Sequence, residues 1–151
     1  MTERTIEILD RMIGRMLAMS FSHNGPRYLS SIARHVRMIE SWEFADLLDA
    51  AVDGGKLSES DRSMLCWVDI ALSGQRRQDG QHLYFVVEAT ADIRVEDVLR
   101  TATHAALLEK LGRPVVPITA GRRIDDGAAI VARERGVWSF LDNELMPPKG
   151  L

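Results

Sequence analysis

Two acidic side chains, Asp69 and Glu88, each interrupt an apolar run in the middle of the chain. Burying a carboxylate in an apolar strand costs free energy unless a cation or a hydrogen-bond donor pairs with it. Residues 67–90 have the pattern of two strands around a polar turn, with one acid on each strand. Two carboxylates on one face of such a hairpin can share Mg²⁺ or Mn²⁺, because these hard cations prefer oxygen ligands. The alternative is a buried ion pair of either acid with Arg94 or Arg100.

The register of the hairpin decides whether the two acids meet. The Asp-Gly pair at 79–80 is a strong turn signal. If Leu72 pairs with Leu83, Glu88 becomes the diagonal neighbour of Asp69 on one face of the sheet. A shift of one residue would place the acids on opposite faces and remove the site. We therefore expect Asp69 and Glu88 on one face, with this register as a working assumption.

The elements around the hairpin follow from hydrophobic spacing. Apolar residues on both faces of the strand over 83–87 predict a central strand. The clearest helix covers 95–111 and ends at Gly112, and a buried strand over 114–119 follows it, which predicts a parallel crossover. Further predicted elements are a strand near 34–40, helices over 41–53, 58–65 and 125–135, and a short strand over 137–141.

The N-terminal helix is predicted over 3–19, where Ile6, Leu9, Ile13 and Met16 form an apolar stripe. The residues at 23–26, which include Gly25 and Pro26, are expected to break it. The stripe also fits a short heptad seam, so it indicates either packing within the domain or a homodimer through residues 3–19.

The predicted fold class is α/β, with a mixed central sheet flanked by helices and an extra N-terminal helix. We divide the chain into an N-terminal helix over 1–20, an α/β domain over 21–145 and a tail over 146–151.

Composition excludes several classes of protein. The 151 residues, 46% of them hydrophobic, suit one domain with a single core, and the net charge of −3 gives no global basic field.

The single cysteine, Cys66, fits a reducing compartment and is expected to be buried. No signal sequence or membrane span is evident, so we expect a cytoplasmic protein with no membrane partner. The spacing of the four histidines, His104 among them, matches no zinc site.

Arginines are the residues that would neutralise phosphates if DNA binds, and the alternative is that they are solvated loop charges. The candidates are Arg27, Arg34, Arg37, Arg76, Arg77, Arg122 and Arg123.

The order of elements, with one acid on each hairpin strand, resembles the restriction-endonuclease-like PD-(D/E)xK nuclease superfamily. Within it, the chain is most similar to an uncharacterised bacterial branch that often carries a coiled coil before this domain. The resemblance covers roughly residues 27–141. The segments that carry it are Leu47–Asp49, Leu57–Glu59, Val68–Leu72, Val86–Thr90, Glu96–Val98 and Val115–Gly121.

The resemblance implies a restriction-endonuclease-like core and a metal-dependent phosphodiesterase, in which Asp69 and Glu88 hold Mg²⁺ or Mn²⁺ and the metal activates a water. Thr90 stands where the motif has its lysine, and Thr90 carries no charge. Arg94 or Arg100 could bring a cation to the site instead, although an arginine is a poor proton shuttle. We therefore expect a nuclease-like domain with a degenerate site that is catalytically weak or inactive and serves binding or assembly. The alternative is an Mg²⁺- or Mn²⁺-dependent DNA endonuclease with an arginine in place of the motif lysine.

Overall fold

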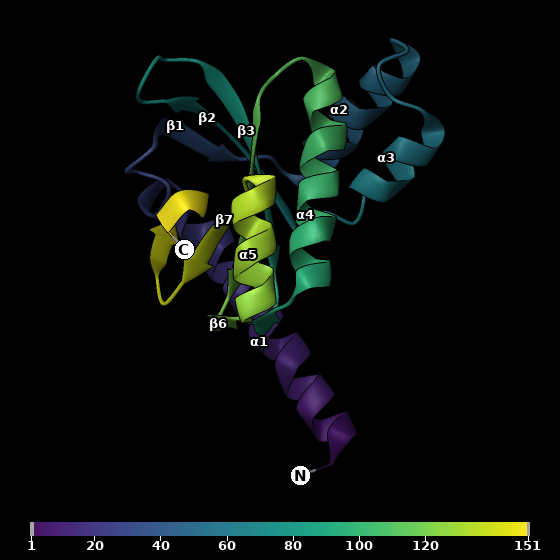
Figure 1. Cartoon of the computed structure of the whole chain (residues 1–151). Coiled ribbons are helices and arrows are strands. Elements are labelled where there is room, and N and C mark those ends of the chain that lie inside the picture. The colour runs from purple at the N-terminus through teal and green to yellow at the C-terminus, as the bar shows by residue number, and fades with distance from the viewer. Residues whose placement is uncertain (1, 151) are drawn as a thin grey trace.

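A computed structural model describes residues 2–150 as a mixed α/β structure, in which a curled sheet of six strands is covered by helices (Figure 1). Met1 and Leu151, the outermost residues of the predicted N-terminal helix and tail, lie outside the described residues. The strand order in the sheet is β1-β2-β3-β5-β7-β8. Its strands are β1 (Ala33–Met38), β2 (Ile70–Arg76), β3 (His82–Ala89), β5 (Val115–Gly121), β7 (Trp138–Leu141) and β8 (Glu144–Met146). The pairs β1–β2, β2–β3 and β7–β8 are antiparallel, and β3–β5 and β5–β7 are parallel.

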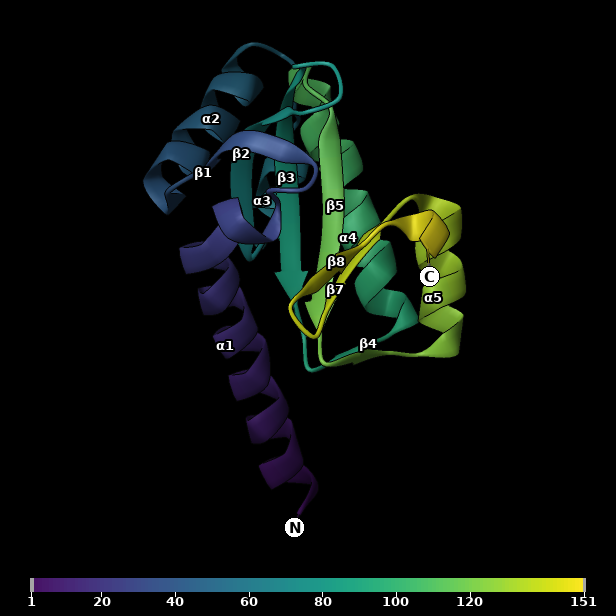
Figure 2. The ribbon, with the colours of Figure 1, turned by 90° about the vertical axis from the view of Figure 1, so that its left-hand side faces the viewer.

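Five α-helices accompany the sheet in the described part of the chain. They are α1 (Glu3–Tyr28), α2 (Ser41–Asp53), α3 (Glu59–Leu65), α4 (Val95–Leu108) and α5 (Asp126–Arg135). Short 3₁₀ helices cover Glu109–Leu111 and Pro148–Gly150, and β4 (Asp92–Ile93) pairs in parallel with β6 (Arg123–Ile124). Figure 2 shows α1 on one side of the sheet and α4 on the other.

Successive side chains of β3 point to opposite faces of the sheet, and because they are apolar on both faces, both faces are covered. Phe85 and Val87 pack in the cluster that includes Phe21 of α1. Tyr84 and Val86 pack in a second cluster with residues of α2, α3 and α4. The predicted central strand is thus confirmed, because β3 has paired neighbours on both sides and apolar residues on both faces.

The strand–helix–strand unit β3–α4–β5 is parallel, as the sequence predicted. Glycines in the left-handed backbone conformation end the helical segments that begin with α4 and α5. Gly112 has φ 97° and follows the 3₁₀ turn after α4, while Gly136 has φ 71° and follows α5. The predicted capping box at Ser58 is also present, with the Asp61 backbone N–H donating to Ser58 Oγ at 3.0 Å.

The first helix differs from its prediction, because α1 continues to Tyr28 through a kink at Asn24 (φ −116°) with Pro26 inside it. Tertiary packing overrides the breaker signal. Phe21 and Gly25 are buried against the sheet, and a Cβ on Gly25 would lie 2.7 Å from Leu72 Cδ2. The helix therefore also runs through the predicted boundary at residue 20, and its N-terminal half extends beyond the sheet (Figure 2).

The hairpin register differs from the assumed one by two residues, since Leu72 pairs with Phe85 and not with Leu83. The reason is that Ser73–Arg76 continue β2, which leaves a loop of only residues 77–81, with Gly80 at φ 75°. A shift of two keeps every side chain on its predicted face.

Three short strands were not predicted. Of these, β8 follows a turn in which Asp142 and Asn143 adopt positive φ values of 52° and 61°. The expected burial of Cys66 is wrong, because this residue ends α3 and its side chain is exposed. Across residues 2–150, none of the helices combines the length and the apolar character needed to cross a bilayer.

Candidate functional site

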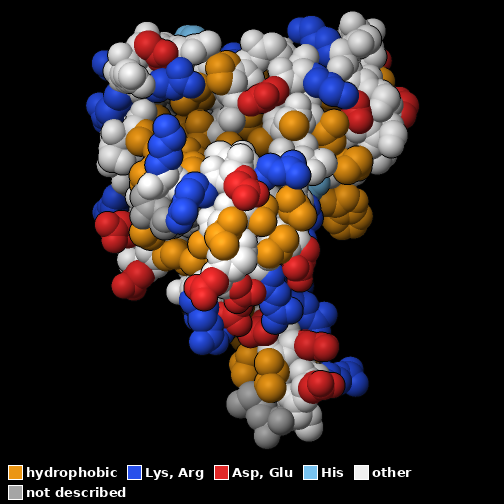
Figure 3. Space-filling model, viewed as in Figure 1, with side chains coloured by type: hydrophobic (Ala, Val, Ile, Leu, Met, Phe, Trp, Pro, Cys, Tyr) orange, Lys and Arg blue, Asp and Glu red, His pale blue; other side chains and the backbone are white. Residues whose placement is uncertain are grey.

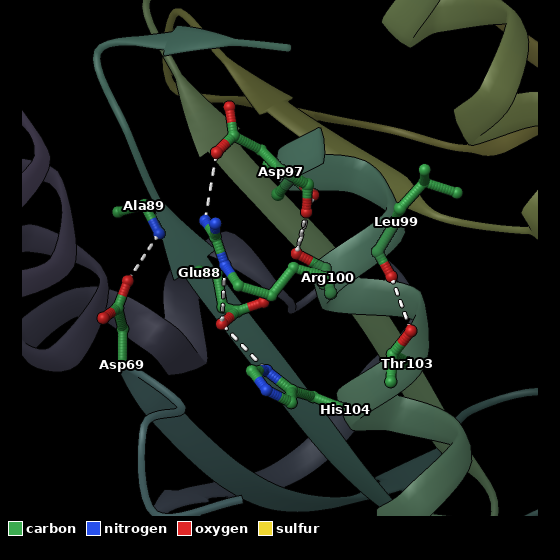
Figure 4. A network of polar contacts seen from close by, with 10 residues as sticks. Asp69, Glu88, Ala89, Asp97, Leu99, Arg100, Thr103 and His104 are labelled. Carbon is green, nitrogen blue, oxygen red and sulfur yellow. Dashed lines mark hydrogen bonds and ion pairs between the residues drawn. The ribbon is translucent and has the colours of Figure 1, made fainter. Parts of the chain in front are cut away.

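Glu88 is the buried acid of the site, with 3% of its surface exposed. It lies near the end of β3 on the face toward α4, because it alternates with the residues that face α1. His104 Nδ1 of α4 lies 2.9 Å from Glu88 Oε1, and Arg100 Nε lies 3.6 Å from the same oxygen. The other oxygen, Oε2, is buried without a hydrogen-bond partner among the described residues. Glu88 Oε1 thus has two partners within the chain, and both are side chains of one helix (Figure 4).

The first turn of α4 holds Arg100 in this position. Asp97 Oδ1 accepts a hydrogen bond from Arg100 Nη2 at 3.0 Å, and Asp97 Oδ2 accepts one from the Arg94 backbone N–H at 2.9 Å. Arg100 and His104 are four residues apart and therefore share one helix face, above Glu88. Arg94, the other predicted cation, is exposed at the N-terminus of α4 and contacts neither acid of the pair in the described structure.

Asp69 directly precedes β2, and continuing the β2–β3 register by one step places it opposite Glu88. Its Oδ2 accepts a hydrogen bond from the Ala89 backbone N–H at 2.9 Å. The residue retains solvent exposure, yet atoms around the carboxylate partly desolvate it. This partial burial raises the pKa of Asp69 above its ordinary value, and the negative charge of Glu88 adds to the rise against the lowering effect of the Ala89 amide.

The two carboxylates do not point toward a shared space in this arrangement. Asp69 is directed at the Ala89 amide, whereas Glu88 is directed at His104 and Arg100 (Figure 4). Within residues 2–150, no group of three or more histidine, cysteine or acidic side chains has a geometry that could hold a metal ion. A divalent cation would also meet the guanidinium of Arg100 beside Glu88. The residues as arranged therefore do not fit the Mg²⁺ or Mn²⁺ site that the sequence predicted.

A hollow of about 300 Å³, which we call the α1 hollow, lies between α1 and the end of β3. Thr90, at the position of the motif lysine, lines it together with Asp69. Asp10, Arg11 and Arg15 of α1 line the opposite wall. Arg94, Asp97 and Thr90 line an adjacent hollow of about 180 Å³. The side chains around the α1 hollow thus carry both signs of charge.

The seven arginines predicted to meet phosphate lie at opposite ends of the sheet. Arg34 and Arg76 belong to paired strands at the end where the β2–β3 loop lies, and Arg77 begins that loop. Arg27 is at the end of α1, just before β1, and Arg37 lies further along β1. Arg122 and Arg123 lie beyond the end of β5 and pair with Asp92, at 3.7 and 2.8 Å. No single surface therefore unites the predicted set.

Sequence reasoning missed two contributors to the site. The spacing of His104 matches no zinc pattern, but position 104 lies four residues after Arg100 on an amphipathic helix. A buried acid on a strand that precedes such a helix is the signal that could have identified it. The α1 residues that line the α1 hollow gave no signal, because their approach to Thr90 depends on how α1 crosses the sheet.

Comparison of the chain with protein-family models, with curated proteins and with solved structures finds no match.

Proposed function

We propose that this chain is a nuclease-like α/β domain that lacks hydrolytic activity and serves as a binding and assembly module. The element order supports the nuclease-like part of the proposal. Helix α1, strand β1, strand β2 with Asp69 before it, the Glu88-bearing strand β3, helix α4 and strand β5 occur along the chain in the order on which the resemblance to PD-(D/E)xK nucleases rests. Helices α2 and α3 lie between β1 and β2, and the short β4 lies between β3 and α4.

The observation that carries the proposal is the pairing of Glu88 with His104 and Arg100. A carboxylate that binds a catalytic metal must present free oxygen lone pairs to a space that water and substrate can enter. Glu88 is buried, and one of its oxygens already has two cationic or donor partners. Its charge therefore stabilises the packing of α4 on β3 in this proposal.

The residue at position 90 also supports a lack of hydrolytic activity. In the motif, a lysine at this position would offset negative charge next to the acids, whereas Thr90 has only a hydroxyl group. Of the two arginines that could replace that lysine, Arg94 shares a hollow with Thr90 but contacts neither acid in the described structure, and Arg100 is bound to Glu88 and Asp97. In this proposal, hydrolysis is disfavoured because both acids are directed at other partners and Arg94 contacts neither of them.

The assembly part of the proposal rests on α1. Large apolar side chains lie exposed along its N-terminal half, with Met16 67% and Met19 62% exposed. We call these residues the α1 stripe: Ile6, Ile8, Leu9, Met12, Met16 and Met19. Most of these positions recur at helical spacing on the side opposite the buried Gly14 and Phe21. Exposed apolar surface of this kind marks an interaction site, and a second copy of α1 is the occupant we propose.

Mass measurement tests the assembly. The double substitution Met12→Glu with Met16→Glu should convert the assembly to the mass of one chain in light scattering, because two carboxylates cannot be buried in an apolar seam. The control is Ser60→Glu with Ser63→Glu, which adds the same charge on exposed positions of α3. A wild-type mass equal to one chain, or equal effects of both double variants, would refute this part of the proposal.

A DNA endonuclease with Mg²⁺ or Mn²⁺ at Asp69 and Glu88 is the second candidate. The observation in its favour is that Arg100 lies at Glu88 and is half exposed, so an arginine is available where the motif lysine is absent. In this alternative, Arg100 turns from Glu88 toward phosphate, and Arg11 and Arg15 at the α1 hollow add positive charge.

Incubation with plasmid, single-stranded DNA and RNA in Mg²⁺ or Mn²⁺ distinguishes the two candidates. The wild type and the variants Asp69→Asn and Glu88→Gln should all leave these substrates intact if the domain is silent. Cleavage by the wild type that disappears in both variants would establish the endonuclease and overturn our first proposal.

A further inference from the structure

A hollow of about 330 Å³ lies at the opposite end of the sheet from the acids, and we call it the hairpin-end hollow. Its volume lies in the range of about 300–1,000 Å³ that is usual for small-molecule sites. Side chains from several elements line it, among them Arg76, Arg77, Leu83, Val116 and Trp138. These residues belong to the β2–β3 hairpin and to the first halves of β5 and β7. The sequence assigned no site to this combination.

The floor of the hollow is apolar. Leu83, Val116 and Trp138 come from β3, β5 and β7, which are neighbours in the sheet, and all three pack with the cluster on the α1 face. Further along this face, Phe21 and Tyr28 of α1 cover Phe140 with ring centroids 5.0 and 4.5 Å away. Trp138 remains partly exposed, so an indole ring forms part of the open floor.

The rim of the hollow carries positive charge. Arg77 Nε donates a hydrogen bond to the Ser30 carbonyl, and the Arg77 backbone N–H donates to the Ile32 carbonyl at 3.0 Å, which fixes the position of this residue. Among the described residues, no carboxylate pairs with Arg77 or with nearby Arg34, whose strand neighbour is Gln75. Arg76 pairs with Asp79 at 2.9 Å. Figure 3 shows several Lys and Arg side chains over the part of the surface where β1 and the hairpin lie.

An apolar floor with an indole and a rim with a guanidinium that has no carboxylate partner among the described residues favour one kind of ligand. A flat apolar ring can stack on Trp138, while an anionic group accepts hydrogen bonds from the guanidinium of Arg77. We propose that the hairpin-end hollow binds a small organic anion in which a planar ring carries one phosphate or carboxylate group. A nucleoside monophosphate and an aromatic carboxylate share this chemistry. The site is independent of whether Glu88 takes part in hydrolysis, since it lies at the other end of β3.

Calorimetric titration of the whole chain with adenosine monophosphate, 2-naphthoate, adenosine and inorganic phosphate tests the proposal. We expect saturable binding of at least one of the two ring-bearing anions, and binding at least tenfold weaker for adenosine and for phosphate alone. Preference for the monophosphate or for the naphthoate identifies the natural source of the anion. Failure of both ring-bearing anions to bind saturably would overturn the proposal.

Three variants assign the binding to this hollow. Arg77→Gln and Trp138→Leu should each weaken binding of the preferred anion about tenfold or more, whereas Arg122→Ala at the other end of the sheet should leave it unchanged. Melting curves establish that each variant is folded, and Arg77→Gln replaces an exposed side chain and so leaves the core intact. Equal binding by Arg77→Gln and wild type would overturn the proposal, as would binding of a single-stranded oligonucleotide in the absence of any binding of the small anions.

Discussion

The two ends of the central sheet differ in how far their arginines are paired with acids. At the end where β3 and β5 finish, acids and arginines neutralise one another: Arg100 lies 3.6 Å from Glu88 and 3.0 Å from Asp97, and Arg123 lies 2.8 Å from Asp92. Arg123 also lowers the pKa of Asp92 below its ordinary value by a direct hydrogen bond. At the hairpin end, Arg76 pairs with Asp79, whereas Arg34 and Arg77 have no carboxylate partner in residues 2–150.

This contrast indicates which end of the sheet has charged groups available for a ligand. A charge that has an internal partner contributes to folding and has little left to offer a ligand, because a new contact must first break the old one. An exposed arginine without a carboxylate partner can bind an anion without breaking an ion pair. Asp69 and Glu88 are therefore weaker candidates for binding a ligand than Arg34 and Arg77.

The largest change in the free energy of unfolding is expected when His104 is replaced. We expect His104→Ala to lower the free energy of unfolding by about 3–5 kcal/mol, because it leaves the buried Glu88 with only the more distant Arg100. Urea denaturation measures the change. His82→Ala, at an exposed position where β3 begins, should change stability by less than about 0.5 kcal/mol. Equal stabilities of the two variants would show that the Glu88–His104 contact is not formed in solution.

A smaller effect is expected at Arg100. Since this side chain is about half exposed, solvent screens its attraction to Glu88 and Asp97, and Arg100→Ala should cost about 1 kcal/mol. The matched change at the hairpin end, Arg34→Ala, removes an exposed arginine that has no acidic partner and should cost close to nothing. If Arg34→Ala costs as much as Arg100→Ala, the contrast between the two ends of the sheet fails.

The smallest effect should come from Asp69, and it has the opposite sign. Partial burial raises the pKa of Asp69 in the folded state above the unfolded value of about 3.9. The folded state therefore binds the proton more tightly, so the stabilisation is complete below pH about 3.9 and is lost as the pH rises through the higher folded pKa. We expect Asp69→Asn to stabilise the protein at pH about 7 by less than about 1 kcal/mol, since the residue keeps solvent exposure.

Denaturation at several pH values measures this gain. The advantage of Asp69→Asn should shrink as the pH falls below the folded pKa of Asp69, because the wild-type carboxyl is then neutral as well. A variant that is less stable than wild type at neutral pH would mean that the carboxylate at position 69 is stabilising in the folded chain, contrary to its surroundings.

Much of the fold could be predicted because the deciding signals are local. The apolar run over 83–87, the capping box at Ser58 and the glycines at 112 and 136 each act within a few residues. The continuation of α1 past Pro26 could not be predicted in this way. It depends on Gly25 approaching Leu72 of β2, which is a contact between segments far apart in the sequence.

The candidate site was only partly predictable for the same reason. The sequence pattern predicted Asp69 and Glu88 on one face of neighbouring strands. In the structure the register is shifted by two residues, so continuing it by one step places the two acids opposite each other. The partners of Glu88 depend on the rotation of α4 about its axis relative to β3, which puts Arg100 and His104 above the acid. Sequence spacing gives the helix face on which these residues lie, but not the strand residue that the face covers.

Thermal unfolding in the presence of Mg²⁺ or Mn²⁺ tests most directly whether the charge of Glu88 is compensated inside the chain. A metal bound to the folded state at about 100 times its dissociation constant would add about 2.7 kcal/mol to stability. The account predicts that millimolar metal shifts the melting temperature of the wild type no more than that of Glu88→Gln. A rise in the wild type that is absent from both Glu88→Gln and Asp69→Asn would contradict it and would establish a metal site at these two acids.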